Sequence, residues 1–544
     1  MPVRNRRAWC TSGMDAGDRP ISRSYGRAVT QTVSQTLPMT YLPYAKTTLA
    51  LVAALSLTAC AQLEPRPLTE QTLIDQNRAD QQSAQQDVEP IIGALTLDEA
   101  MARALKYNLD RRARLLEQAL AFQQYDVSRY DMLPKLLAQA GYSSRDNDKI
   151  SQSRNAEDGS LSQSRFISQD RDHTVSSLAL SWNMLDLGVG YYGARQQADR
   201  ALVAGEKRRK AMHLLMQDVR TAFWRAVSAQ KLGSEVRAAT QMAEEALADA
   251  RQAEAERLRN PLDSLRYQRQ VLENLRLLEA IEQELSTAQT ELALLINAPL
   301  GQPITLVEPA FELDRQALAV PVAVMEDTAL GANADLREAH YNARIAREET
   351  RKTLVRLFPS LNFSYGLNYD TDSYLVNRQW NEAGVQLSFN LFNLLTGPGQ
   401  LKLAEAGVAL ADQRRVSMQM AVLAQVHLAR QQLANAQHQF SRADAIWTID
   451  RRISEHMDNR EAMQVQSKLD RVANQTTTIL SLLRRYQALA QAQTAEARLQ
   501  ATLGVEPEIG SVGDLTLAEL TRTLAAGHGN WQTLARRDGQ ESSR

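Results

Sequence analysis

Three glycines in the first half of the chain have the spacing of a nucleotide-binding loop. Gly188-Val-Gly190-Tyr-Tyr-Gly193 matches the pattern that brings a backbone close to a dinucleotide pyrophosphate, and it lies between a predicted strand and a predicted helix. Such a site also needs a second parallel strand carrying an acid about 20 residues further on. Here Glu206-Lys-Arg-Arg continues one long helix instead, so we interpret these glycines, like Gly397-Pro398-Gly399 later in the chain, as a bend between strand and helix.

The other reactive side chains do not predict a catalytic or metal site. The seven histidines are scattered, with no pair at the three- or four-residue spacing that would set two ligands on one helix face. The sequence contains no Gly-x-Ser-x-Gly nucleophile motif and no phosphate loop. We therefore predict that the chain is not an enzyme and uses no cofactor and no metal.

Both cysteines, Cys10 and Cys60, precede the part of the chain that is predicted to fold, which excludes a disulfide or a cysteine-ligated metal there. Cys60 follows the apolar run Leu49–Leu57, which is typical of a signal-peptide core and too short to span a bilayer stably. Leu57-Thr-Ala-Cys60 resembles a bacterial lipobox. We predict that residues 1–59 form a signal region and that Cys60 begins the mature chain and carries acyl groups such as palmitate.

The residues around the signal region predict where the lipoprotein is sorted and where translation starts. Ala61, and not aspartate, follows the cysteine, which resembles lipoproteins that are sorted to the outer membrane. The basic, serine-rich stretch before Met39 is not needed by a signal peptide, so we expect translation to start at Met39. Residues 60–92 are predicted to be the lipidated N-terminus and a polar linker. The alternative is a cytoplasmic protein with a chance apolar run.

The chain contains one strand–helix unit twice. Leu178-Ala-Leu-Ser-Trp-Asn-Met-Leu185 is echoed about 207 residues later by Val385-Gln-Leu-Ser-Phe-Asn-Leu-Phe392, and each segment passes through glycine into a long helix. An internal repeat decides the architecture before any local motif does. We place the repeats at 93–310 and 311–507, followed by a C-terminal helix and tail at 508–544. Two further matches support them: Met132–Leu136 with Leu357–Leu361, and Asn108–Arg111 with Asn333–Leu336.

The composition favours packed helices and argues against a nucleic-acid partner. Aromatic residues make up only 6% of the 544 residues, whereas alanine and glutamine are abundant, which suits close helix packing better than a broad sheet core. The formal net charge is −1, and acidic and basic residues are interspersed. No basic surface for nucleic acid is therefore predicted.

Four segments alternate as membrane β-strands do. Leu361–Tyr369 has the cleanest alternation of large apolar with small polar residues, Leu178–Leu185 and Val385–Phe392 follow it, and Leu136–Tyr142 is weaker. Strands of about 9–11 residues with one apolar face are typical of outer-membrane barrels, and a half-buried soluble sheet is the alternative. Four strands cannot close a barrel in lipid, so several chains must share one.

The helices predicted between the prolines are too long for an ordinary globular domain. No proline lies between positions 134 and 261 or between 398 and 507, and a helix over Tyr192–Arg259 would be roughly 100 Å long at 1.5 Å per residue. In the returning helix of each repeat, apolar residues follow the three- and four-residue steps of a coiled-coil seam. They are Leu278, Ile281, Leu285, Ala288, Leu292 and Leu295, and then Ile479, Leu482, Tyr486 and Leu489.

Together these residues resemble the TolC-like outer-membrane efflux family, over nearly all of the chain from Leu95 to Pro507. The features that carry the resemblance are the lipobox, Leu95-Thr-Leu-Asp-Glu-Ala100 leading to Asn108, the proline-marked strand entries and the strand–glycine–helix exits. The resemblance implies a mainly α fold with a membrane β-barrel. Long antiparallel coiled-coil helices would form a periplasmic α-barrel, and a homotrimer with four β-strands per chain would form a twelve-stranded barrel.

The function that this resemblance implies is that of a passive exit duct in a tripartite efflux or type I secretion system. The duct would be lipid-anchored in the outer membrane and would extend into the periplasm. Its partners would be a periplasmic adaptor (membrane fusion) protein, an inner-membrane transporter and the outer-membrane lipid, with no nucleic acid.

Family members dock adaptors and gate at the tips of their helical hairpins, which suggests residues for both roles here. The first tip contains Arg259, Asn260 and Pro261, with Asn-Pro in place of the usual glycine turn. The second is expected near His456–Arg460 and contains Asn459. A ring of acids at a constriction would bind cations, because threefold symmetry multiplies each carboxylate. The candidates are Asp458 and, second, Asp263, with an ordinary solvated helix-end acid as the alternative for each.

Two other classes of protein remain open at this point. A periplasmic coiled-coil adaptor or scaffold lipoprotein without a channel would pair the same strands in a soluble sheet. An enzyme is the third class, but the sequence offers it no nucleophile and no metal ligands.

Overall fold

The computed structural model describes residues 67–256, 260–309, 316–461, 468–505, 512–526 and 531. The chain divides into two compact units, Met1–Asn77 and Arg78–Arg544. In the first unit the described residues are 67–77, which contain the start of helix α2 (Glu70–Gln85). The following description concerns the second unit.

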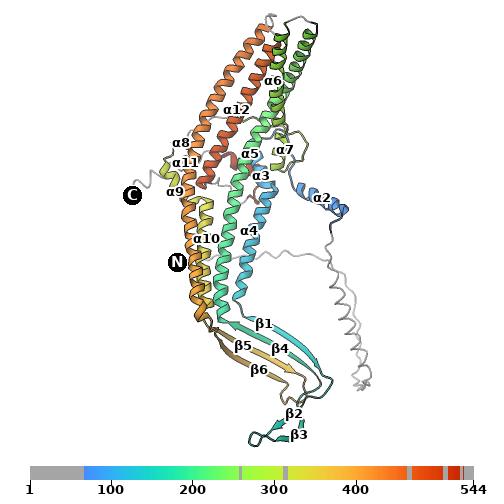
Figure 1. Cartoon of the computed structure of the whole chain (residues 1–544), viewed down its shortest axis with the longest axis vertical. Helices are drawn as coiled ribbons and strands as arrows, with labels where there is room; N and C mark the ends of the chain where they lie inside the picture. The colour runs from blue at the N-terminus through green and yellow to red at the C-terminus, as the bar shows by residue number, and fades with distance from the viewer. Residues whose placement is uncertain are drawn as a thin grey trace, which may run out of the picture. The chain divides into compact units, whose positions relative to one another are not determined.

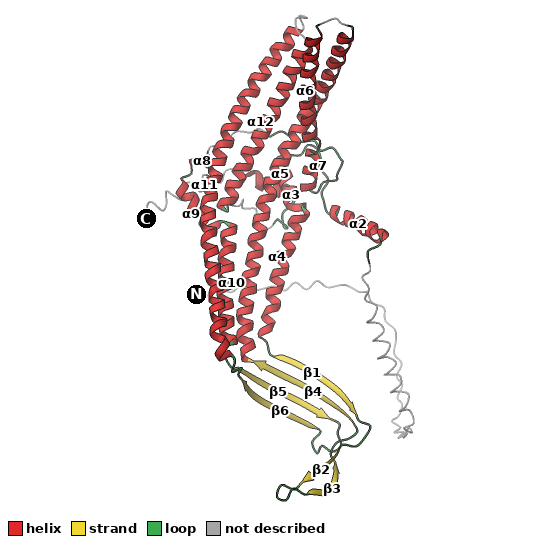
Figure 2. Cartoon of the chain, viewed as in Figure 1, coloured by secondary structure: helices red, strands yellow, loops and turns green. Residues whose placement is uncertain are grey.

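Helices dominate the second unit, and its strands gather at one end of the helices (Figures 1 and 2). In the first repeat the described elements are α3 (Leu97–Tyr107), α4 (Leu109–Ser128), the 3-10 helix η2 (Arg129–Met132), β1 (Lys135–Ser144), β2 (Ile150–Arg154), β3 (Leu161–Ile167), β4 (Asp172–Asn183), α5 (Met184–Ala255), α6 (Pro261–Ser286) and α7 (Ala288–Leu295). In the second repeat they are α8 (Gln316–Ala319), α9 (Val322–Ala332), α10 (Ala334–Arg356), β5 (Ser360–Asp370), β6 (Gln379–Ser388), α11 (Asn393–Glu461) and α12 (Lys468–Leu503), and α13 (Leu517–Ala526) follows.

Equivalent asparagines start the first long helix of each repeat. Asn108 caps α4, because its Oδ1 accepts the backbone N–H three residues on at 3.0 Å, and its amide donates to the carbonyl of Leu295 at 3.0 Å. Asn333 caps α10 in the same way, at 3.0 Å, and donates to the carbonyl of Thr502 at 2.8 Å. In each repeat the returning helix therefore ends where the first helix begins, so α7 lies above α4 and α12 above α10 (Figure 1).

Among the described residues, β1, β4, β5 and β6 form one antiparallel sheet in that order. The alternation of large and small residues sets the register, because a slip by one residue would turn every side chain to the other face. Trp182 pairs with Phe363, and Leu178 pairs with Leu367. β2 and β3, which lie between β1 and β4 in the chain, form a separate hairpin.

The helices continue the order of the strands to which they are joined. α5 packs against both α4 and α10, and α10 packs against α11, so the helices next to the sheet run in the order α4, α5, α10 and α11 (Figure 1). Further from the sheet, α6 packs on α5, α5 on α12, and α12 on α11. The first repeat therefore occupies one edge of this layer and the second repeat occupies the other.

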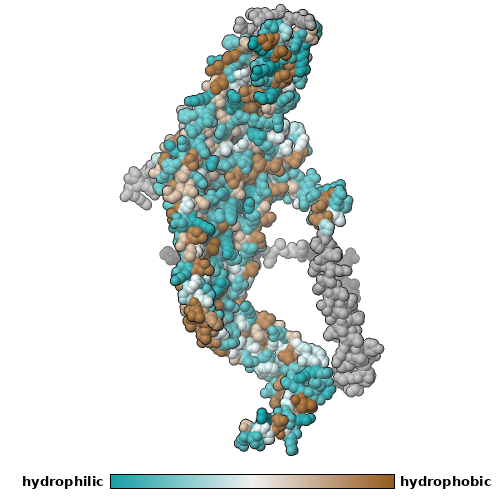
Figure 3. All heavy atoms as spheres, in the orientation of Figure 1, coloured by the Kyte–Doolittle hydropathy of each residue, from teal (hydrophilic) through white to brown (hydrophobic). Residues whose placement is uncertain are grey.

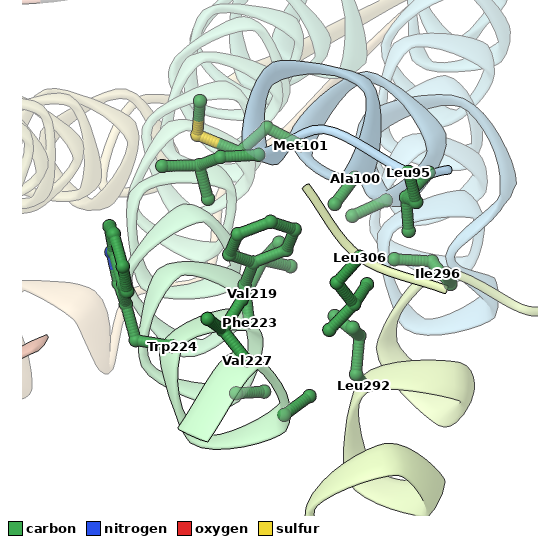
Figure 4. Packing of buried hydrophobic residues seen from close by; sticks show 14 of the residues in the cluster. Leu95, Ala100, Met101, Val219, Phe223, Trp224, Val227, Leu292, Ile296 and Leu306 are labelled. Atoms are coloured by element: carbon green, nitrogen blue, oxygen red, sulfur yellow. The ribbon is translucent and has the colours of Figure 1, made fainter. Parts of the chain in front are cut away.

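Apolar side chains from both repeats build the cores. In the first core Phe223 of α5 faces Leu95 and Leu292, whereas Trp224 projects from the other side of the helix; all four are almost fully buried (Figure 4). The C-terminal helix α13 returns to pack on α3 and adds Leu520 to this core. The last described helix therefore completes the core of the first repeat.

The predicted strands end earlier than expected, and the following helix begins earlier. β4 ends at Asn183, whose Oδ1 accepts the N–H of Leu185 at 2.9 Å and so caps α5. α5 therefore spans Met184–Ala255, where the prediction was Tyr192–Arg259. β6 ends at Ser388, four residues before the predicted end.

The glycines of the strand–helix joint lie inside helices, so their interpretation as a bend was wrong. A Cβ added at Gly188 would lie 2.9 Å from Cγ1 of Val355, and one at Gly190 would lie 3.3 Å from the carbonyl oxygen of Asp131. The absence of a side chain lets the start of α5 approach its neighbours closely. The three glycines do not form a dinucleotide-binding loop, because a regular helix runs through this motif.

The coiled-coil seam is largely confirmed, with one residue shifted. The predicted residues from Leu278 to Leu292 are buried, although the helix breaks at Thr287 between α6 and α7. In α12 the buried leucine is Leu483, whereas Leu482 is half-buried.

Candidate functional site

The two faces of the sheet differ in chemistry. One face carries large apolar side chains that remain exposed, such as Leu180 at 41% and Tyr365 at 45%. The opposite face carries small polar residues, and Ser181 donates to Oδ1 of Asn362 there at 3.1 Å. The apolar set comprises Leu136, Leu178, Leu180, Trp182, Phe363, Tyr365, Leu367, Val385 and Leu387. The sheet thus presents an apolar surface that the described residues leave uncovered.

Both edges of this sheet and helix layer are also open. Within the described residues, β1 and β6 each pair with a strand on one side only. The helices at the same edges, α4 and α11, carry exposed leucines along their length. Apolar side chains gather where β6 passes into α11, at Leu391, Phe392, Leu394 and Leu395 (Figure 3). Such surfaces on a chain of this length indicate contact with lipid or with other chains.

At the end of the sheet away from the helices, a polar network joins the loops of the two repeats. His173 Nδ1 lies 2.9 Å from Oδ1 of Asp370, and both residues are buried. The hydroxyl of Ser373 donates to Asp170 at 2.8 Å. The backbone N–H and the hydroxyl of Ser373 hold the pKa of Asp170 below its usual range. Hydrogen bonds therefore join the loop before β4 to the loop after β5 at this end of the sheet.

Asn260 and Pro261, which were predicted to supply the first turn, lie at the start of helix α6. Asn260 caps α6, because its Oδ1 accepts the N–H of Leu262 at 3.1 Å, and Pro261 occupies the first helical position. Asp263 lies in the first turn of α6 with its side chain 65% exposed, 3.8 Å from Arg266. Arg259 lies outside the described residues.

The residues predicted to form the second turn, His456–Arg460, lie in helix α11. α11 continues through Asp458 and Asn459 to Glu461, and α12 begins at Lys468. Asp458 and Asn459 are therefore helical, and residues 462–467 lie outside the described residues. Cys60 lies outside the described residues.

Neither a membrane-spanning helix nor a metal-binding cluster occurs among the described residues. None of the helices in the described ranges is long and apolar enough to cross a membrane. Over the same ranges, no group of three or more histidine, cysteine, aspartate or glutamate side chains could hold a metal ion.

The known proteins that match this chain were found by comparison of structures. No protein-family model and no curated protein sequence matches the chain. The outer-membrane channel OprN matches with a TM-score of 0.58 at 15% identity, over 75% of this chain and 90% of that one. The CmeC outer-membrane channel of Campylobacter jejuni matches with a TM-score of 0.58 at 13% identity, over 79% and 89%. The open state of the Neisseria gonorrhoeae MtrE outer-membrane channel matches with a TM-score of 0.56 at 16% identity, over 75% and 88%.

The chain therefore has the fold of the TolC-like outer-membrane efflux channels, as the residue pattern predicted. At these identities the shared feature is the fold: long helices joined to a sheet of antiparallel strands, in two repeats.

Proposed function

We propose that the protein is the outer-membrane exit duct of a tripartite efflux or type I secretion system and conducts solutes passively. The observation that carries this proposal is a sheet whose apolar face is uncovered and whose two edges are open. A sheet with open edges is prohibitive in lipid, whereas a closed barrel with an apolar outer face is the stable form. The small polar residues of the other face would then line the lumen.

Three copies would close this barrel. Four strands per chain would give twelve, which is within the range of outer-membrane barrels. Each chain has a first-repeat edge (β1 and α4) and a second-repeat edge (β6 and α11), so joining unlike edges around a threefold axis would form a ring. The 72-residue α5 would extend this ring about 108 Å from the sheet at 1.5 Å per residue, into the periplasm.

Residues singled out in the sequence would supply the remaining parts of such a duct. Acylation of Cys60 would anchor each chain to the membrane. A periplasmic adaptor would dock at the two helical turns through Arg259, Asn260, Pro261 and Asn459. Three copies of Asp263 or of Asp458 would form an acidic ring near the same end, which would favour cations. The exposure of Asp263 at the start of α6 supports this role.

The proposal is tested by the mass and location of the native complex. Density-gradient fractionation followed by light scattering of the detergent-extracted protein should find three chains in the outer-membrane fraction. Cys60→Ala should abolish acyl labelling and still give three chains. A water-soluble single chain would contradict the duct and support a periplasmic scaffold.

The acidic ring is tested by conductance in planar bilayers. Asp263→Asn and Asp458→Asn should each reduce the preference of the channel for cations if that acid lines the constriction. Glu70→Gln is a control, since Glu70 is an exposed acid of α2 that lies neither on the polar face of the sheet nor at either turn. An unchanged ion preference in both turn variants would remove the ring from the proposal.

A further inference from the structure

A cavity of about 370 Å³ lies where two helices of the second repeat meet end to end. α12 ends at Leu503, α10 begins at Ala334, and both helices pack against α5 and α11. Asn333 and Thr502, whose hydrogen bond joins the two helix ends, belong to the wall of the cavity. Its volume is within the range of small-molecule sites, about 300–1,000 Å³.

The charges of the cavity wall do not cancel. Lys210 Nζ lies 2.8 and 3.0 Å from the two carboxylate oxygens of Asp335, so these two charges neutralise each other. Arg498 of α12 also lines the cavity, and within the described ranges it has no ion-pair partner. The other side chains of the wall are neutral apart from His213, which can only add positive charge. The cavity therefore favours an anion.

Two leucines in the same wall are exposed. Leu214 of α5 is 50% exposed and Leu428 of α11 is 56% exposed, and both line the cavity. The glutamines around them, Gln217, Gln425 and Gln432, carry amides that can donate and accept hydrogen bonds. A ligand that covered the leucines would gain the free energy of removing apolar surface from water. The wall thus suits a molecule with an anionic group and an apolar body.

The cavity opens on the face of the long helices that lies away from the cores. At 3.6 residues per turn, Gln217 of the wall and the buried Val219 lie on nearly opposite faces of α5. Thr494 of the wall and the buried Ala492 are related in the same way on α12. Val219 belongs to the core that includes α3 and α13, and Ala492 to the core that includes α8 and α9. These short helices therefore lie on the other face.

In the proposed duct, the face that carries the cavity would be the inner one. The short helices would narrow the bore if they lay inside it, so an open duct needs them on its outer face. The cavity is also separate from the acidic ring proposed near the helical turns. Gln217 is 38 residues before Ala255 at the end of α5, which is about 57 Å at 1.5 Å per residue.

We propose that this cavity binds a small organic anion with an apolar body, such as an aromatic carboxylate, and that such anions are among the solutes that the duct conducts. The carboxylate would accept two parallel hydrogen bonds from the guanidinium of Arg498. The apolar body would cover Leu214 and Leu428. This inference rests on the duct proposed above and names a class of solute for it.

Equilibrium dialysis against 2-naphthoate tests the site. The full chain is reconstituted in lipid nanodiscs, and empty nanodiscs give the background. 2-Naphthoate should bind once per chain. 2-Naphthylmethylammonium has the same apolar body and a positive charge, and it should bind at least tenfold more weakly. Equal binding of the two probes would show adsorption to apolar surface and would overturn the site.

Substitutions in the wall test which residues hold the probe. Arg498→Gln should weaken the binding of 2-naphthoate about tenfold, because it removes a charged hydrogen-bond donor. Arg484→Gln is the matched control, since Arg484 is also an exposed arginine of α12 but lies 14 residues earlier, about 21 Å along the helix, and does not line the cavity. Leu428→Gln should also weaken binding, with no change in charge. Equal losses in the two arginine variants would overturn the site.

Ion preference in planar bilayers tests whether the cavity faces the lumen. Three copies of Arg498 in the wall of the bore would attract anions, so Arg498→Gln should shift the preference of the channel toward cations. An unchanged preference would overturn the passage of these anions through the duct.

The site and the duct can fail separately. A complex of three chains in the outer-membrane fraction that does not bind 2-naphthoate would contradict the site and leave the duct standing. A single chain that binds 2-naphthoate through Arg498 would contradict the duct and leave the ligand site standing.

Discussion

The side-chain amide of Asn333 donates to the backbone carbonyl of Thr502 at 2.8 Å, and both residues are buried. The oxygen of the same amide caps α10, so one side chain joins the end of α12 to the start of α10. We expect Asn333→Ala to lower the free energy of unfolding by about 2 kcal/mol, because a cap and a buried hydrogen bond are both lost. Denaturant unfolding followed by circular dichroism measures this. Asn333→Asp keeps the capping oxygen and should lose less.

Gly504 should not accept a side chain. Its φ is +70°, and an added Cβ would lie 2.2 Å from the carbonyl oxygen of Ala332. Gly504→Ala should therefore cost more than the roughly 1–2 kcal/mol of a left-handed backbone alone. Gly301→Ala is the matched control, since its φ is +81° and nothing lies within 4 Å of the added atom. Equal losses of thermal stability in the two variants would contradict the steric account.

Two glycines in the same helix are predicted to respond in opposite directions. Gly188→Ala should destabilise the protein, because its methyl group would lie 2.9 Å from the stiff side chain of Val355. Gly193→Ala should stabilise it by about 0.5–1 kcal/mol, since that Cβ meets nothing within 4 Å and alanine favours the helix. Thermal unfolding of both variants measures the difference. Val355→Ala combined with Gly188→Ala should recover part of the loss.

The ion pair between Asp199 and Arg344 joins α5 of the first repeat to α10 of the second. Arg344→Ala would leave the buried Asp199 carboxylate without this partner, at a cost of about 1–3 kcal/mol. Asp199→Ala with Arg344→Ala removes both charges together. The double variant should therefore be more stable than Arg344→Ala alone in denaturant unfolding. A double variant less stable than Arg344→Ala would contradict the idea that the unpaired Asp199 carboxylate causes the loss of stability.

Low pH should destabilise the hydrogen bonds between Asp170 and Ser373 at the end of the sheet away from the helices. The donors of Ser373 lower the pKa of Asp170 in the folded protein, so its contribution to stability is complete above the unfolded pKa and is lost as the pH falls through the folded pKa. Hydrogen exchange at Ser373, corrected for intrinsic rates, should rise in that acid range and not near neutral pH. Asp170→Asn should exchange faster at neutral pH and show a smaller acid step. An identical pH profile for both proteins would contradict this role.

Much of the fold followed from the sequence, because alternation and repetition are properties of single segments. The repeat and the strand faces were predicted from residue types. Asn260-Pro261 was predicted as a turn, whereas its role as the cap of α6 was not predicted. The helix start at Met184 was missed, since it depends on the side chain of Asn183 accepting a local hydrogen bond. The role of Gly188 was also missed, because Val355, which approaches it, lies in another repeat. Contacts of this kind depend on tertiary packing, which periodicity does not encode.

The packing of α13 on α3 joins the end of the chain to its beginning. Leu517, Leu520 and Leu524 of α13 join a core whose other buried residues lie before position 310, apart from Phe440, Tyr486, Leu489 and Ala490 of the second repeat. A ribosome or a translocation pore delivers the chain from its N-terminus, so the first repeat emerges without part of its own interior. The first core is therefore complete only after α13 has been made.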